Sequence, residues 1–243
     1  MIPKNHPRYK SLVTREHLAE NARSGIVSWE GLISHGRGEA FDYLIGEKTS
    51  ESARRAARTA AALLRTARHP VISVNGNTAV LAAQKIALLQ KVSGALVEVN
   101  LFHRTSERVQ QIETLLRNAG VDVFSGNAER LLPLSHDRAF CRREGMYAAD
   151  VVLVPLEDGD RCGVLVAMGK KVIAIDLNPL SRTAKTATLT IVDDVTRALP
   201  LIAEACASIT GEECRDLIAT LDNPAFLREA RDEMAARLCH ALD

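Results

Sequence analysis

The amino-acid sequence predicts an α/β fold in which a mainly parallel, Rossmann-like sheet is flanked by helices. From residue 71 onwards, short apolar runs alternate with helical segments. Two of these runs, 149–155 and 172–175, are nearly all apolar, as expected of strands covered on both faces. Helical sequence precedes and follows the alternating part. We therefore expect one domain, 1–243, with an N-terminal helical layer (1–69), a Rossmann-like core (70–208) and C-terminal helices (209–243).

The helical layer is expected to fill most of residues 9–67. A polar helix begins near Arg15, and an alanine-rich helix follows at 50–68, with Thr49 or Ser50 as its N-cap. Between them, the segment 33–47 places charged side chains around two glycines, Gly36 and Gly38. Glycines leave a backbone open to close approach, so we interpret this segment as a ligand clamp rather than a plain connector.

The core is expected to alternate strands with helices. The patterns predict strands at 71–74, 95–99, 121–124, 149–155, 172–175 and 188–192. Helices are expected at about 79–91 and 106–119, with Gly120 as a C-cap, and a short helix precedes Gly169. Two further helices, 195–208 and 224–242, would cover the sheet or mediate association.

Composition excludes several functional classes. Lysine and arginine total 31 against 30 aspartate and glutamate, so the long-range basic field of a general nucleic-acid binder is not expected. No apolar run approaches the roughly 20 residues of a membrane span, and the N-terminus lacks a signal-peptide apolar region, so we expect a cytoplasmic protein. The five cysteines form no C-x-x-C pair and are expected to be free thiols; a nucleophilic role for Cys162 is disfavoured.

Four loops follow predicted strands and should meet at one edge of the sheet: 75–77, 100–105, 157–161 and 176–183. The last carries Asp176, which can accept hydrogen bonds from a ribose, together with Arg182 and Thr183, which can reach phosphates. This loop is the strongest candidate for a nucleotide site.

The other loops carry weaker signals. Asn75 to Asn77 could present backbone N–H groups to an anion, although an ordinary strand–helix turn has the same sequence and no P-loop lysine follows. Arg104 could bind a phosphate or carboxylate, or only a surface acid. The acidic loop with Asp158 suits Mg²⁺ or a base for an attacking ammonium, and a solvated acidic loop is an equally good interpretation.

Several long stretches resemble one family. In chain order they are HPRYKSL, GLISHGRGEAFDYLIGEKT, NGN, EVNLF-x-R, EGMYAADVVLVPLEDGDR and VAMGKKVIAIDLNPLSRTA, and together they run from about residue 2 to 208. They resemble the archaeal-type phosphopantothenate synthetases, or 4-phosphopantoate–β-alanine ligases. Cys162 and Gly163 depart from the polar pair expected there, and the tail after Ser208 carries little of the resemblance.

The resemblance implies an ATP-dependent amide ligase of coenzyme A biosynthesis that works as a homodimer. It would join 4-phosphopantoate to β-alanine through an acyl adenylate and release AMP and pyrophosphate, with Mg²⁺ as cofactor. It places ATP contacts on Arg15, Arg37, Asp176, Leu177, Asn178, Arg182, Thr183, Asp194 and Val195. It also points to Arg37, Asp158 and Arg182 as catalytic, to His35, Asn77 and Arg104 for 4-phosphopantoate, and to Asp158 as a Mg²⁺ ligand or the group that positions the amine.

A second class remains open from the residues alone: a non-ligase nucleotide or dinucleotide-binding module, like the central domain of thiamine-diphosphate enzymes. Arg37 and Arg182 beside one ligand edge provide more positive charge than a passive adenine site requires. A nicotinamide dehydrogenase fits less well, because Asn75-Gly76-Asn77 is not G-x-G-x-x-G and no acidic residue ends the next strand. A structural scaffold would leave the glycine-flanked Arg37 unexplained.

Overall fold

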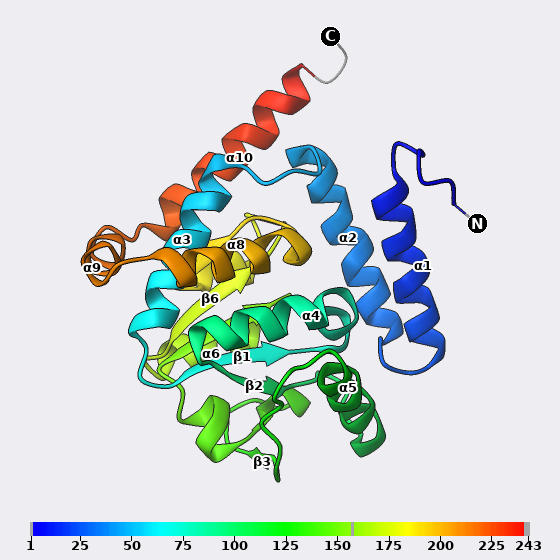
Figure 1. Ribbon diagram of the computed structural model, residues 1–243, viewed down its shortest axis with the longest axis vertical. Helices are drawn as coiled ribbons and strands as arrows, with labels where there is room; N and C mark the ends of the chain where they lie inside the picture. The colour runs from blue at the N-terminus through cyan, green and yellow to red at the C-terminus, as the bar shows by residue number, and fades with distance from the viewer. Residues whose placement is uncertain (1, 157, 241–243) are drawn as a thin grey trace.

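The structure, a computed structural model, describes residues 2–156 and 158–240 and has a parallel sheet at its centre (Figure 1). The strands are ordered β2–β1–β5–β6–β7, all parallel. The chain therefore leaves β1 in one direction to form β2 and in the other to form the remaining strands. In such sheets a ligand crevice lies where the order reverses, here outside the carboxyl ends of β1 and β5. The bounds are β1 (Pro70–Val74), β2 (Leu96–Val99), β5 (Val151–Pro155), β6 (Lys171–Ile175) and β7 (Leu189–Ile191).

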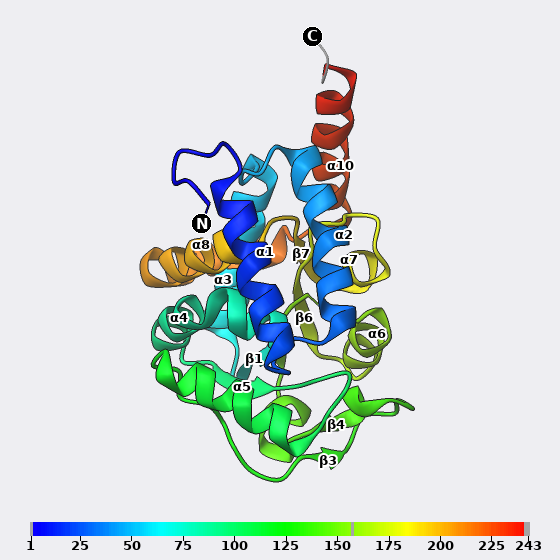
Figure 2. The ribbon, with the colours of Figure 1, turned by 90° about the vertical axis from the view of Figure 1, so that its right-hand side faces the viewer.

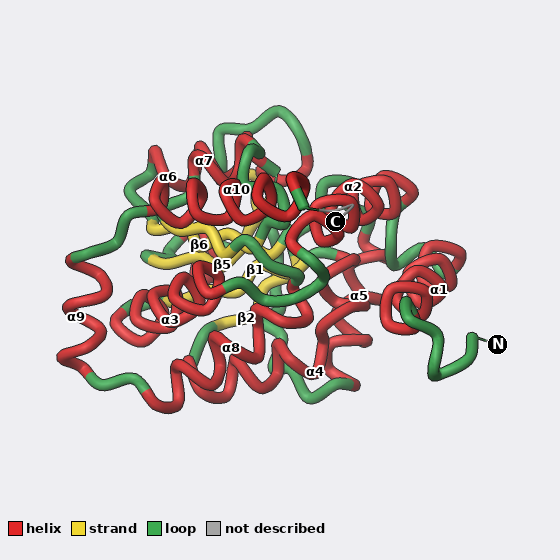
Figure 3. The backbone as a smooth tube through the Cα atoms, turned by 90° about the horizontal axis from the view of Figure 1, so that it is seen from above, coloured by secondary structure: helices red, strands yellow, loops and turns green. Residues whose placement is uncertain are grey.

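Helices cover both faces of the sheet (Figure 3). Alternate residues of β1 point to opposite sides: Ile72 and Val74 join one buried cluster, and Val71 joins the other. The first cluster is closed by α3 (Glu51–Thr66), α4 (Gly76–Ser93), α5 (Ser106–Asn118) and α8 (Val195–Ser208). The second lies under α6 (Gly159–Ala167), with α7 (Arg182–Thr186) on the same side.

The C-terminal tail forms two helices, α9 (Gly211–Ala219) and α10 (Asn223–Cys239). Cys214 of α9 is buried against Ala62 of α3, and Ala230 and Met234 of α10 pack with Ile45 of α2. The tail thus joins the core to the N-terminal helical layer. Among the residues that the structure describes, no helix combines the length and apolar character that a membrane span needs.

The two N-terminal helices, α1 (Tyr9–Arg23) and α2 (Trp29–Ile45), stand across the carboxyl ends of the strands (Figure 2). Ser28 caps α2 by accepting a hydrogen bond from Gly31 N, and Gly46 ends it in a left-handed conformation. The segment 33–47, interpreted above as a clamp with an open backbone, is therefore mostly helical, and that detail of the interpretation was wrong. The close approach that glycine permits occurs at Gly31, where a Cβ would lie 2.4 Å from Asn77 Oδ1.

Other differences from the sequence-based predictions occur in the middle of the chain. The predicted strand 121–124 is only one bridge, Val97 with Val123. The segment that follows pairs β3 (Glu129–Arg130) with β4 (Phe140–Cys141) in an antiparallel ribbon that no pattern predicted. Asp160 and Arg161, expected in an acidic loop, lie in the first turn of α6, and Glu157 lies outside the described residues.

A buried ion-pair network ties α2 to the core. Arg197 of α8 bridges Asp42 of α2 and Asp193, whose side chain is completely buried. Thr49 also donates to Asp193, at 2.6 Å. Burial acts to lower the pKa of Arg197, but its hydrogen bond to Asp42 and the charges of both aspartates raise that pKa above its ordinary value. The guanidinium is therefore a permanent charge that fixes α2 beside the start of α8.

Candidate functional site

A cavity of about 550 Å³ opens at the carboxyl edge of the sheet, where the strand order reverses. Its walls come from α2, from the ends of β1 and β2, and from the loops that follow β5 and β6. Eight residues predicted from the sequence line it: His35, Arg37, Asn77, Asp158, Asp176, Leu177, Asn178 and Thr183. The structure thus brings together residues that are far apart in the sequence.

The loop after β6 forms a polar wall. Asp176 Oδ1 accepts from Asn178 N at 2.9 Å, and its Oδ2 accepts from the hydroxyl of Ser181 at 2.5 Å. Ser181 in turn accepts from Ala184 N and caps α7. Burial raises the pKa of Asp176, while these hydrogen bonds and the charge of Arg37 act to lower it. The carboxylate is thus held in a fixed orientation at the cavity wall, with Arg37 as its nearby cation.

Helix α2 supplies the opposite wall. Burial lowers the pKa of His35, an effect that the charges of Glu39 and Asp194 partly offset. His35 is thus a neutral hydrogen-bonding group at neutral pH. Arg37 lies two residues further on in the same wall, and Gly38 packs against Leu177, with 3.5 Å between Leu177 Cδ1 and a Cβ placed on the glycine. Helix α2 therefore packs directly on the loop that follows β6.

The turn between β1 and α4 closes the floor. Asn75 Nδ2 donates to the carbonyls of Pro155 (3.2 Å) and Leu156 (3.0 Å), so this side chain joins the ends of β1 and β5. Leu156 has a φ of +56°, an unusual conformation for a residue with a side chain, and it lines the cavity. Asn77 Nδ2 donates to Gly31 O at 2.8 Å and so connects the turn to α2.

The end of β2 and the following segment add cations that sequence reasoning missed. Arg108 of α5 lines the cavity; its Nε and Nη1 donate to the carbonyls of Ile26 and His103. Arg138, only 7% exposed, and His103 line the same wall. Arg108 lies one helical turn after the predicted loop 100–105, so its place near the site could have been predicted. Arg138 lies in a segment without periodicity, and no sequence pattern indicated its position.

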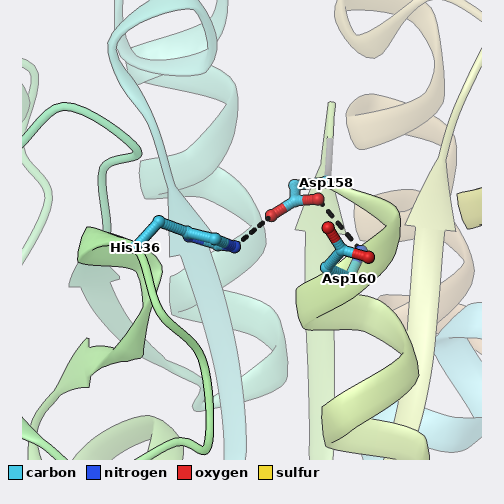
Figure 4. A group of neighbouring side chains, drawn as sticks. All are labelled: His136, Asp158 and Asp160. Carbon is cyan, nitrogen blue, oxygen red and sulfur yellow. Dashed lines mark hydrogen bonds and ion pairs between the residues drawn. The ribbon is translucent and has the colours of Figure 1, made fainter.

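Asp158 lies beside two other potential metal ligands, His136 and Asp160 (Figure 4). The ligand atoms of the three lie within 4.8 Å of one another. However, Asp160 is ion-paired with Arg182 at 2.5 Å, and Asp158 Oδ1 caps α6 by accepting from Asp160 N. Mg²⁺ prefers oxygen ligands in octahedral geometry. One imidazole and two engaged carboxylates therefore suit a resident Mg²⁺ poorly.

Five predicted site residues do not line the cavity. Arg15 pairs with Glu39 at 2.9 Å, and Asp194 caps α8 through Thr196. Both act on the pKa of His35, so they lie beside the cavity wall. The side chain of Val195 is buried in the core, which leaves only its backbone for a ligand. The other two are Arg182, exposed and paired with Asp160, and Arg104, whose Nη1 is buried without a hydrogen-bond partner among the described residues.

Comparisons with known proteins agree with the resemblance. The family model described as phosphopantothenate/pantothenate synthetase matches residues 52–237. A curated 4-phosphopantoate–β-alanine ligase of Methanospirillum hungatei is 59% identical over 243 residues and covers all of both chains. The protein of the same name from Methanosarcina mazei is 54% identical, covering 98% of this chain and 95% of its own length. That of Thermococcus kodakarensis is 46% identical, covering 98% and 93%. On these matches, the chain belongs to the phosphopantothenate/pantothenate synthetase family.

Proposed function

We propose that this protein joins 4-phosphopantoate to β-alanine at the expense of ATP, forming 4'-phosphopantothenate for coenzyme A biosynthesis and releasing AMP and pyrophosphate. The observation that carries the proposal is one cavity with two different ends. The Asp176 loop and Arg37 form a nucleotide-type end, and Arg108 and Arg138 form a second cationic end. The names of the relatives supply the two organic substrates.

The nucleotide end suits ATP. Asp176 can accept hydrogen bonds from the ribose or adenine, with Leu177 and Asn178 beside it. Arg37 would meet the phosphates from α2, and Arg182 and Thr183 would meet them from the start of α7. At the start of α8, Val195 would offer its backbone N–H near His35, and Asp194, whose own N–H donates to Asp193, would offer its side chain beside Arg15. Mg²⁺ would enter with ATP as part of the substrate.

The second end suits the phosphate of 4-phosphopantoate. Arg108, Arg138 and His103 gather there beside Gly76 and Asn77, the first residues of α4. A helix N-terminus and two guanidinium groups are favourable partners for a dianion. We therefore assign the phosphate contact to Arg108 and Arg138 in addition to Asn77 and His35, which line the same cavity. Arg104 does not line it and would act only indirectly.

For the reaction itself, the protein mainly has to align the two substrates. The carboxylate of 4-phosphopantoate would attack the α-phosphate of ATP, because adenylation gives the acid a good leaving group. Arg37 and Arg182 would stabilise the charge that develops as pyrophosphate departs. For Asp158 we favour the positioning of β-alanine's amine over a resident metal, given the engaged ligands around it.

A passive nucleotide-binding module is the second candidate. Such a module would explain the Asp176 loop, but it would not require Arg108 and Arg138 at the second end of the cavity. The ligase accounts for both ends of the cavity with one reaction, so we favour it.

The reaction itself can be measured with ATP, Mg²⁺, 4-phosphopantoate and β-alanine, each omitted in turn. We expect AMP, not ADP, and only when 4-phosphopantoate is present. Pantoate should react poorly because it offers no phosphate to the cationic end of the cavity, at a cost of about 2–5 kcal/mol. Formation of ADP would contradict the adenylate route, and no consumption of ATP would favour the binding module.

Arg37→Ala and Arg182→Ala should lower ligase kcat/KM by about 100-fold while leaving the melting temperature unchanged, because both side chains are exposed and would act on phosphates. Arg231→Ala, an exposed arginine paired with Asp232, is the matched control for activity. Arg197→Ala gives the opposite contrast: it leaves Asp193 buried and unpaired, at about 3–5 kcal/mol, and should lower the melting temperature. Normal turnover in both Arg37→Ala and Arg182→Ala would overturn the nucleotide-site assignment.

A homodimer is supported by the outer face of α2. Trp29, Ile33 and Tyr43 are 67%, 66% and 46% exposed and fall on one side of the helix, opposite the cavity wall. Gly36 and Ala40 lie between them and would let a partner helix approach closely. We expect sedimentation to give a dimer for the native chain and a monomer for Trp29→Glu/Ile33→Glu. A native monomer, or an unchanged dimer in the double variant, would contradict this assignment.

A further inference from the structure

His136 and Asp158 form a pair at the edge of the cavity (Figure 4). His136 Nε2 lies 3.4 Å from Asp158 Oδ2, and the side chains are only 20% and 18% exposed. Asp158 lines the cavity, whereas His136 stands behind it on the segment between β3 and β4. A proton that reaches Asp158 from the cavity therefore has an imidazole as its next neighbour.

The imidazole is held by one ring contact, and the backbone that carries it is held by hydrogen bonds. It stacks on Phe102, which lines the cavity, with 4.7 Å between ring centroids and 24° between planes. The carbonyl of His136 accepts from Ala139 N at 3.0 Å, and the next residue, Asp137, accepts from Arg104 N at 3.0 Å. No pattern in the sequence indicated this placement of His136.

The proposed ligase needs a proton acceptor in its second half. β-Alanine carries an ammonium group at neutral pH, which has no lone pair with which to attack the acyl adenylate. Adenylate formation needs no such acceptor, since the attacking carboxylate is already ionised. An acceptor of this kind would therefore affect one half-reaction and not the other.

We propose that the Asp158–His136 pair takes the ammonium proton of β-alanine. The ammonium donates a hydrogen bond to Asp158, and one proton passes to His136 Nε2. The freed nitrogen lone pair forms the bond to the acyl carbon, the bond from that carbon to the AMP oxygen breaks with its electron pair, and the second nitrogen proton leaves with AMP. This inference rests on the ligase function proposed above and assigns its amine-activating step.

The surrounding charges favour this role. The carboxylates of Asp158 and Asp160 face the imidazole at the start of α6. The cations nearby are directed to other partners: Arg182 binds Asp160, and the Nη1 of Arg130 donates to backbone carbonyls. Further titratable groups among the described residues are His103, which contacts Phe102 edge-on, Asp137 and Arg138 on the following turn, and Arg104, whose N donates to Asp137.

The test separates the two half-reactions in His136→Gln. Hydroxylamine, which is unprotonated at neutral pH, can replace β-alanine as the nucleophile and trap the adenylate without a base. We expect hydroxamate formation to match the native enzyme, whereas amide formation at neutral pH falls about 100-fold. The amide rate should recover steadily as the pH rises, because free β-alanine amine becomes available. His17→Gln, an exposed histidine on α1, is the matched control.

The outcomes are distinct. An unchanged amide rate, or an equal loss of amide and hydroxamate, would overturn the proton-acceptor role while leaving the ligase intact. No hydroxamate from the native enzyme would overturn the ligase mechanism itself. If His136→Gln melts at a lower temperature, Asp158→Asn serves as the second variant and should give the same loss of amide with retained hydroxamate.

Discussion

The parallel pairing of all five core strands is the constraint on which the rest depends. It brings every strand's carboxyl end to one edge, and the reversal of order between β1 and β5 opens the space where their loops separate. Asn75 then joins the two strand ends across that space. The cavity is thus a consequence of topology, and its chemistry depends on the residues that follow each strand.

Helix α2 converts this open edge into an enclosed site. One face carries His35, Arg37 and Gly38 toward the cavity and the loop after β6, and the opposite face is apolar and exposed. The Arg197 network fixes the helix to the start of α8, so binding residues and the proposed subunit contact share one rigid element. Self-association through α2 would therefore also steady the wall that carries Arg37.

Much of this arrangement was readable in the sequence. The loop at Asp176 follows an apolar strand and precedes a helix cap. Such local patterns predict structure well because they do not depend on distant contacts. The segment 33–47 lies in the predicted helical layer, but the bounds of α2 were missed because glycines argue against helix; Gly31 here allows close packing on Asn77. The segment 125–148 could not be predicted, since long-range contacts such as Glu98 with the backbone of Arg142 hold it. Its contributions to the site, His136 and Arg138, were missed for the same reason. That residues 1–243 form a single domain stays a prediction.

Adenylation of a carboxylate in this cavity would transfer one carboxylate oxygen to AMP, and an isotope label follows that transfer. 4-Phosphopantoate labelled with heavy oxygen in its carboxylate would be converted with ATP and β-alanine, and the nucleotide examined by mass spectrometry. We expect one labelled oxygen in the phosphate of AMP, because the bond that breaks in the adenylate lies between that oxygen and the acyl carbon. Label in inorganic phosphate, or AMP without label, would contradict it.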